Sequence, residues 1–304
     1  MKKKKIWYYL TYCISAAILI VLLSKINFSQ IADVFAEAKI KWLIIALLIK
    51  LIACITVSVE KWRLILDMLG LRITLKEAFP IRVGSIPMKI LSPAKLGAAL
   101  RAVYMKKNYS FPLSMGILSI IIELMMNIWA AVMVVMIAGT LTGHLSAYWM
   151  LPVLLMHVFF LLWFRRKKGS IKNILPAWLK RKMRYTDDEK LSDVNMVRFV
   201  SPLILSFIYI LLEIIILYLL VVSLNLSIPL LEVLFFGALT ILISNLPISV
   251  SGIGTREAAV CMFFSKYGDY TVLFSLGFLF TIVVYFLPVF AGLLFMRKFL
   301  RRLI

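Results

Sequence analysis

The sequence has few charged residues, few histidines and few cysteines. Only 16% of its 304 residues are charged, whereas about 25% is usual in soluble domains. The three cysteines, Cys13, Cys54 and Cys261, lie in separate apolar segments, and the two histidines, His144 and His157, stand apart from each other. Disulfide frameworks and metal sites both need clustered ligands, so these spacings exclude them. We therefore expect no metal and no cofactor.

Hydrophobic residues are abundant instead. They make up 63% of the chain, and its mean hydropathy is +0.99. A soluble globular chain is about 45–50% apolar, so one buried core cannot account for this excess. The composition predicts an all-α integral membrane protein with several membrane-spanning helices.

Six apolar runs have the roughly 17–25 residues that cross the hydrocarbon core as a helix. They are residues 6–23, 41–60, 111–138, 149–164, 199–223 and 270–296. Two further apolar segments, 77–107 and 230–266, are interrupted near their middles by Pro, Gly, Ser and a basic residue. Broken helices are tolerated at membrane depth where protein shields them or where they face a cavity. We therefore predict two re-entrant hairpins; if one of them is a pair of spans, the count of transmembrane helices rises from six toward eight.

The positive charge has a distribution that indicates orientation. Lys and Arg number 35 against 14 Asp and Glu, a net charge of +21. Most of the basic residues lie in segments 2–5, 61–76, 106–107, 165–198 and 297–302. The positive-inside rule places these segments and both termini in the cytoplasm, as in a multi-pass protein of the plasma (inner) membrane. Because this rule accounts for the charge, we expect no nucleic-acid partner.

The two broken segments match each other at a constant offset. The matching residues are Glu77, Gly97 and Arg101 in the first and Glu232, Gly252 and Arg256 in the second. On the predicted path the hairpins enter from opposite sides, as in the inverted repeats of secondary transporters. Coincidence between two Gly- and Pro-rich connectors is the alternative. We interpret the chain as one membrane domain, 1–304, with a signal anchor and external loop (1–40), a first repeat (41–138), a connecting span and basic cytoplasmic loop (139–198) and a second repeat (199–304).

The hairpin breaks have the residue types of an anion site. In the second, a helix is expected to restart within 251–255, so its first turn presents backbone N–H groups and a positive dipole end. Glycines there allow an anion to approach closely, and an arginine adds a two-pronged donor. The candidate residues for binding an anionic headgroup are Gly97, Arg101, Gly252, Gly254, Thr255 and Arg256. The alternative is a structural kink in which Arg256 pairs with Glu257, Glu213 or Glu123.

Acidic residues inside the apolar segments also need a reason, because a charge at the bilayer centre is costly. Glu123, Glu213 and Glu257 are candidates for balancing charge or binding a headgroup amine, and a static buried ion pair is the alternative. For Lys50 we favour a side chain that reaches the membrane interface. Arg82, Lys89 and Lys95 of the first hairpin form either a basic entry path or a row at headgroup level.

Several motifs resemble the lysylphosphatidylglycerol synthase transmembrane region, the flippase-like domain of multiple peptide resistance factors. They are Glu60-Lys-Trp-Arg63, Pro93-x3-Gly97-x3-Arg101, and Leu246-Pro247-x4-Gly252-Ile-Gly254-Thr-Arg256-Glu257 with Gly268 at the end of the hairpin. The resemblance covers nearly the whole chain, and the last motif is the most specific. The first hairpin departs from the family pattern, because Ser92-Pro93 replaces a commoner Leu-Pro and Ala98 stands where an acidic residue is frequent.

The resemblance implies lipid handling and a link to antimicrobial peptide resistance. Full-length members join this region to a soluble domain that transfers an aminoacyl group to phosphatidylglycerol, and we expect this chain to be the lipid-handling part alone, with no catalytic residues. We therefore predict an inner-membrane translocase for an anionic phospholipid or a polyprenyl-phosphate-linked headgroup. The alternative is a membrane subunit or partner of a soluble or membrane aminoacyl- or glycosyl-transferase.

Overall fold

The computed structural model describes residues 18, 20–24, 28–91, 97–149, 196–246 and 249–302. Every regular element in these ranges is a helix, and none of these residues forms a strand, which confirms the all-α prediction. The predicted spans over 6–23 and 149–164, the 165–198 loop and the Ser92-Pro93 break lie wholly or mostly outside the described residues. The total of six to eight spans therefore stays a prediction.

Four long helices in the described part of the chain are apolar enough to cross a membrane, and they match four predicted spans. They cover Ile40–Met68, Leu113–Leu141 (α8), Phe199–Ser223 within α12 (Met196–Ser223), and Tyr270–Arg301. The first comprises α3 (Ile40–Leu48), the π-helical η1 (Ile49–Cys54) and α4 (Ile55–Met68), and the last comprises α15 (Tyr270–Thr281), the π-helical η7 (Ile282–Phe286) and α16 (Leu287–Arg301). The short helix α2 (Phe28–Ala36) precedes the first long helix. The 3₁₀ turn η3 (Ala147–Trp149) follows α8.

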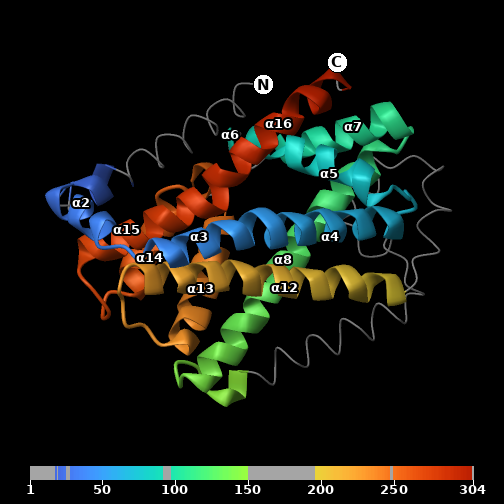
Figure 1. The fold of residues 1–304 in the computed structure, drawn as a ribbon. Coiled ribbons are helices and arrows are strands. Elements are labelled where there is room, and N and C mark those ends of the chain that lie inside the picture. The colour runs from blue at the N-terminus through green and yellow to red at the C-terminus, as the bar shows by residue number, and fades with distance from the viewer. Residues whose placement is uncertain are drawn as a thin grey trace, which may run out of the picture.

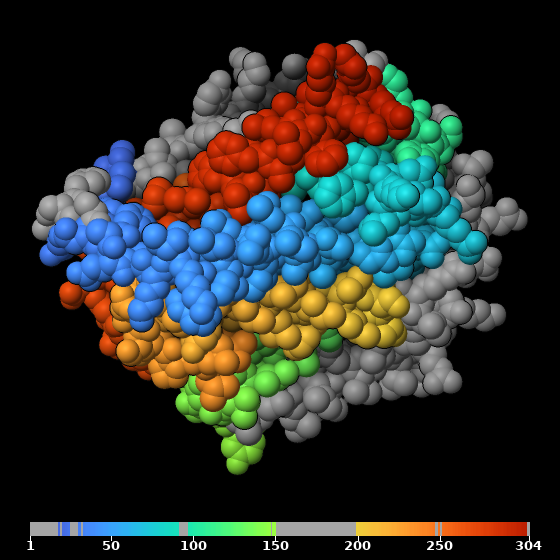
Figure 2. Space-filling view, in the orientation of Figure 1, coloured from blue at the N-terminus to red at the C-terminus, as the bar shows by residue number. Residues whose placement is uncertain are grey.

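The outer surface of the first long helix is apolar. Ile40, Ile44, Leu48 and Ile52 recur at every fourth residue and are 49–66% exposed. Residues four apart share one face of a helix, so these side chains form a continuous ridge. Figure 2 shows this helix running across the front of the molecule between α16 and α12. An extended exposed apolar surface of this kind indicates contact with lipid.

The first long helix and α12 lie side by side and run in opposite directions (Figure 1). The backbone N–H of Lys39, just before α3, donates to the carbonyl of Ser223 at the end of α12 at 2.7 Å. Further along, Lys50 contacts Glu213. Apolar side chains of α12 such as Ile214, Leu217 and Leu220 are fully buried in the core. The two broken segments pack against this pair, and also against α8 and the long helix of α15 and α16.

The first broken segment, here called the first hairpin, comprises α5 (Leu75–Gly84), α6 (Ile86–Leu91) and α7 (Leu100–Tyr109). Its start is fixed by a capping box, in which Glu77 N–H donates to Thr74 Oγ1 at 3.3 Å and Thr74 N–H donates to Glu77 Oε2 at 2.8 Å. Glu77 and Tyr109, from its two ends, line one small pocket. The chain therefore goes in and comes back to the same face, as predicted for a hairpin.

The second broken segment, the second hairpin, comprises α13 (Leu230–Asn245), the 3₁₀ turn η6 (Val250–Gly252) and α14 (Thr255–Phe263). Its ends also lie together, because Lys266 Nζ is 3.2 Å from Glu232 Oε1. The break shows in the backbone: Ser251 and Gly252 have φ of 56° and 83°. Positive φ suits Gly and is uncommon for other residues, so Gly252 is a local sequence signal for the break.

The two hairpins enter from opposite faces and meet at their tips. Asn108 in α7 donates to the carbonyl of Arg302 at 3.0 Å, beside the end of α16, whereas Lys266 precedes the start of α15. Because α15, η7 and α16 form one long helix, these contacts lie at its opposite ends. At the tips, Ser251 Oγ donates to the carbonyl of Ile90 at 3.0 Å. Entry from opposite faces is a requirement of the predicted inverted repeat, whose symmetry itself stays a prediction.

Candidate functional site

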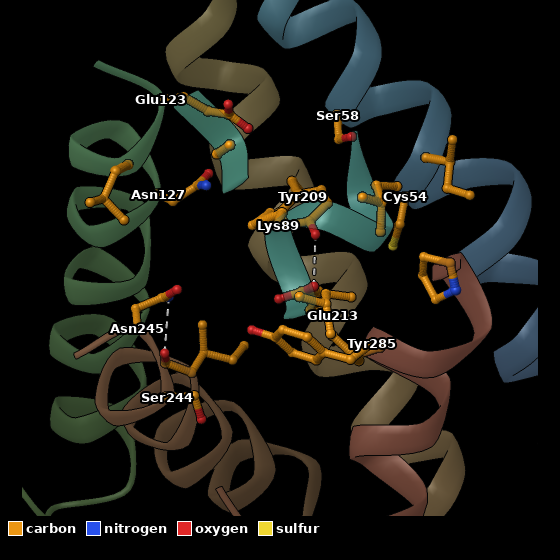
Figure 3. Close-up of a pocket in the computed structure, with 18 of the residues that line it drawn as sticks. Cys54, Ser58, Lys89, Glu123, Asn127, Tyr209, Glu213, Ser244, Asn245 and Tyr285 are labelled. Carbon is orange, nitrogen blue, oxygen red and sulfur yellow. Dashed lines mark hydrogen bonds between the residues drawn. The ribbon is translucent and has the colours of Figure 1, made fainter. Parts of the chain in front are cut away.

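A cavity of about 410 Å³ lies between the two hairpins and is lined by both of them and by the long helices. Arg101 from the first hairpin and Arg256 from the second both line it. Figure 3 shows Tyr209 and Glu213 from α12 and Tyr285 from η7 pointing into the same space. The structure thus brings the two sequence-predicted arginines to one cavity.

Arg101 and Arg82 share one carboxylate in the wall of this cavity. Both guanidinium Nη atoms of Arg101 are 3.2 Å from Glu123 Oε2, and Arg82 Nη2 donates to Glu123 Oε1. All three side chains are buried. Arg82 therefore lies in the interior, which corrects the interpretation that placed it at headgroup level. Glu123 is ion-paired with both Arg101 and Arg82, and its functional role stays a prediction.

A second buried ion pair lines the same cavity. Lys50 Nζ is 2.8 Å from Glu213 Oε1, and the Tyr209 hydroxyl donates to the same oxygen at 2.8 Å. Lys50 is only 4% exposed, so the interpretation in which it reaches the membrane interface is wrong. It lies in η1, and a π-helical turn, which is frequent at functional sites, rotates a side chain away from the position that α-helical spacing predicts.

Arg256 has a different environment from the other cationic groups. Its Nη1 donates to Thr281 Oγ1 at 2.8 Å, and its guanidinium lies over the rings of Tyr285 and Phe280 at 4.2 and 5.7 Å. No carboxylate of the described residues lies within ion-pair distance of it. The pairing of Arg256 with Glu257, Glu213 or Glu123 that a structural kink required is therefore absent from this part of the chain. Its aromatic partner Tyr285 lies in the second π-helical segment, η7.

The hydrogen-bonding groups of the turn before Arg256 have partners within the protein. Gly254 N–H donates to Glu257 Oε2 at 2.7 Å, and Glu257 also accepts from Thr281 Oγ1. The Thr255 hydroxyl is 2.9 Å from Ser249 Oγ. The backbone N–H that we expected to receive an anion is thus occupied by a carboxylate of the same turn. Glu257 caps the helix and lies outside the cavity lining, as do Gly252, Gly254 and Thr255.

Gly97 allows close packing within the first hairpin. A Cβ at this position would lie 1.9 Å from the carbonyl oxygen of Met88, so no other residue fits without backbone movement. Its neighbour Ala98 lines the cavity, whereas Gly97 does not. The structure therefore explains this glycine by the return of the chain over α6. The candidate anion site is therefore lined by side chains, and the predicted glycines do not line it.

Sequence reasoning missed two contributors to this region. Tyr285 had no charge to draw attention to it, although an aromatic residue in a helix that faces a buried arginine is a recognisable pattern. Lys61 was counted with the cytoplasmic segment 61–76, but it is fully buried, with Nζ 2.6 Å from Asn127 Oδ1 and over the Tyr209 ring at 4.5 Å. Both Asn127 and Tyr209 line the cavity, so Lys61 stands directly behind its wall.

The net result is a positively charged interior. Among the residues that the structure describes, five basic residues line the cavity, namely Lys50, Arg82, Lys89, Arg101 and Arg256, against two acidic residues, Glu123 and Glu213. Two guanidinium atoms, Nε of Arg82 and Nε of Arg101, are buried without a hydrogen-bond partner. A buried donor without an acceptor is costly, so these two atoms mark an unsatisfied part of the cavity wall.

Comparison with known proteins gives one result that covers most of the chain. The family described as Lysylphosphatidylglycerol synthase TM region matches residues 9–292. No curated protein matches the chain. The match spans far more than half of the sequence, and the chain belongs to this family.

Proposed function

We propose that this member of the Lysylphosphatidylglycerol synthase TM region family moves an anionic lipid headgroup between the two leaflets of the plasma membrane, with both termini cytoplasmic. One observation carries the proposal. Arg101 and Arg256, two buried side chains on hairpins that enter from opposite faces, line the same cavity. A site reached by one broken segment from each side is the arrangement that alternating access needs.

The physical task is to lower the barrier that hydrocarbon presents to a charged headgroup. A cavity with fixed cationic side chains replaces the water that the headgroup loses. The acyl chains remain in lipid, along apolar outer surfaces such as the Ile40 to Ile52 ridge. The hairpin tips, joined by Ser251 and Ile90, are the natural place for a barrier between the two sides. The driving force is the membrane potential, a proton gradient or the lipid gradient.

The test is lipid movement in liposomes. Purified full-length protein is reconstituted with headgroup-labelled phosphatidylglycerol, and the accessible label is quenched from outside over time. We expect Arg256→Ala to slow movement by about tenfold or more, because it removes charge-assisted hydrogen bonds in a buried site. Arg72→Gln, an exposed arginine paired with Asp67, is the matched control and should behave as wild type.

Three outcomes separate the alternatives. Movement in wild type that Arg256→Ala abolishes supports both the translocase and its site. Movement that is equal in the two proteins supports a translocase but removes Arg256 from it. If folded protein moves no anionic lipid, the translocase proposal fails, and a role as partner of a lipid-modifying transferase becomes the better hypothesis, to be tested by copurification.

A further inference from the structure

Among the described residues, the cavity has no acidic side chain free to receive an amine. Glu123 is shared by Arg82 and Arg101, and Glu213 is held by Lys50 and Tyr209. An amine entering this cavity would have to displace a buried arginine or lysine from its carboxylate. Breaking such a pair inside a protein costs several kcal/mol, because one charge is left uncompensated. Glu257 is engaged as well, by the Gly254 N–H and by Thr281.

The charge balance points in the same direction. Five basic against two acidic lining residues leave an excess of three positive charges. Charges interact strongly where water is excluded, so this excess favours a ligand that compensates most of it. A phosphodiester headgroup without an amine has one negative charge and leaves most of the excess in place. A terminal phosphomonoester has close to two negative charges above neutral pH, and a diphosphate has more.

Arginine side chains line the cavity from both hairpins. On the first hairpin, Nε of Arg82 and Nε of Arg101 have no hydrogen-bond partner, and both residues are more than nine-tenths buried. On the second, Arg256 lies against Tyr285 with no carboxylate of the described residues within ion-pair distance. A terminal phosphate offers three oxygens with acceptor capacity in several directions, whereas a phosphodiester offers two.

We propose that the cavity selects lipid headgroups with a terminal phosphate or diphosphate, which have two or more negative charges, and rejects headgroups that bear an amine. This inference rests on the proposed function, because it names the substrate class of the same site. It runs against what the family's name suggests, since a lysylated headgroup brings a positive charge into an already positive cavity. Zwitterionic headgroups are disfavoured for the same reason.

The experiment measures binding by the purified full chain in uncharged detergent at pH 8. The probes are phosphatidic acid and geranylgeranyl diphosphate, with phosphatidylglycerol, phosphatidylethanolamine and lysylphosphatidylglycerol for comparison. We expect the first two to bind at least about tenfold more tightly than phosphatidylglycerol, since each added charge-assisted hydrogen bond contributes that much. The two amine-bearing lipids should bind more weakly than phosphatidylglycerol. Inorganic pyrophosphate is included to distinguish a lipid headgroup from a free phosphate compound.

Arg82→Gln tests the site within the same assay. It should reduce the preference for phosphatidic acid over phosphatidylglycerol by about tenfold, whereas Arg72→Gln should leave the preference unchanged. If Arg82→Gln does not fold, Arg82→Lys is used in its place, because it keeps a positive charge beside Glu123 but lacks the Nε donor. A preference that neither variant alters would remove Arg82 from the site and overturn the proposal.

The outcomes for the probes are distinct. Lysylphosphatidylglycerol binding as tightly as phosphatidic acid overturns the inference, and so does equal binding of phosphatidic acid and phosphatidylglycerol. In either case, movement of phosphatidylglycerol in liposomes would leave the proposed function standing. Pyrophosphate binding as tightly as geranylgeranyl diphosphate assigns the site to a free compound and overturns the lipid assignment. If folded protein binds none of these lipids, both the inference and the proposed function fail.

Discussion

The Ser251 hydroxyl donates a hydrogen bond to the Ile90 carbonyl at 3.0 Å, joining the tips of two hairpins that are 161 residues apart in the chain. Ile90 also lines the cavity, so the contact lies at its edge. Ser251 is buried and has a positive φ, which orients its side chain across the gap. A contact between two elements that enter from opposite faces is suited to open and close without unfolding either helix.

Linking the hairpin tips should stop lipid movement. Ile90→Cys and Ser251→Cys are combined in a protein whose native cysteines are replaced by alanine, and a short bis-methanethiosulfonate reagent joins them through reducible disulfides. We expect the linked protein to move lipid at least about tenfold more slowly, with recovery on reduction, because a closed tip contact cannot exchange between two states. The two single-cysteine proteins are the controls. Linked protein that moves lipid at the rate of reduced protein would show that the tips need not separate.

The hairpin breaks were predictable from sequence, but their meeting was not. Gly252 and Gly254 mark positions of positive φ, and the second hairpin is broken there. These are local signals, because backbone conformation depends on the residue itself. The contact of Ser251 with Ile90 depends on how two distant segments pack, and its acceptor is a backbone carbonyl that every residue possesses. No residue type in the sequence identifies such a partner.

Two buried lysines of the first long helix should respond differently to the same substitution. Lys50→Met leaves Glu213 as an uncompensated buried charge, and we expect it to destabilise the protein by about 3–5 kcal/mol. Lys61 has no carboxylate partner among the described residues, so Lys61→Met loses the bond to Asn127 and the contact over the Tyr209 ring and should cost about 1–2 kcal/mol. Thermal unfolding in detergent measures both. Equal losses of stability in the two variants would mean that the ion pair with Glu213 is not the main contribution of Lys50 to stability.

The ion pairs show where sequence reasoning about the site stops. Glu123 and Glu213 were recognised as buried acids, and Arg101 and Arg256 as basic candidates, but the assignment of partners stayed open. In the structure Glu213 pairs with Lys50, because the π-helical turn directs the Lys50 side chain toward α12. A π-helical turn shifts the register of one helix face, and hydrophobic periodicity does not reveal it. Charges can therefore be counted from sequence, whereas their pairing follows from helix rotation.

Gly97→Ala should disrupt the first hairpin. The added Cβ would lie 1.9 Å from the Met88 carbonyl oxygen, which is backbone and cannot turn aside. We expect a loss of more than about 2 kcal/mol, as for an overpacked core, with reduced lipid movement. Gly237→Ala is the matched control, because its Cβ would first meet a flexible methyl group of Leu217 at 3.0 Å. If both variants unfold at the same temperature, the close approach at Gly97 has been overestimated.

Acid should weaken the contact at the entry of the second hairpin. Burial alone would raise the pKa of Glu232, but its hydrogen bonds with His144 and Lys266 more than offset this and hold the pKa below its ordinary value. A carboxyl group whose pKa is lowered by folding stabilises the protein above its ordinary pKa, about 4.3, and loses this contribution as the pH falls through the lowered value. We expect the unfolding temperature to fall between about pH 5 and pH 3.

Glu232→Gln should flatten that part of the pH profile, since the amide cannot titrate. Glu37→Gln, which alters an exposed carboxylate near the same face, is the control and should keep the slope of wild type. A Glu232→Gln protein with an unchanged slope would assign the acid sensitivity to other carboxylates.

Arg256→Lys should separate charge from geometry at the proposed binding site. A lysine keeps the positive charge but loses the planar group that lies over Tyr285 at 4.2 Å and the second prong that a phosphate would receive. Because no carboxylate of the described residues pairs with Arg256, the substitution should leave the unfolding temperature nearly unchanged. Binding of phosphatidic acid should weaken by about tenfold, since bidentate recognition is replaced by a point charge. Arg72→Lys on the surface controls for the substitution itself. Wild-type affinity in Arg256→Lys would mean that Arg256 contributes only charge, and the two-pronged contact with phosphate would have to be abandoned.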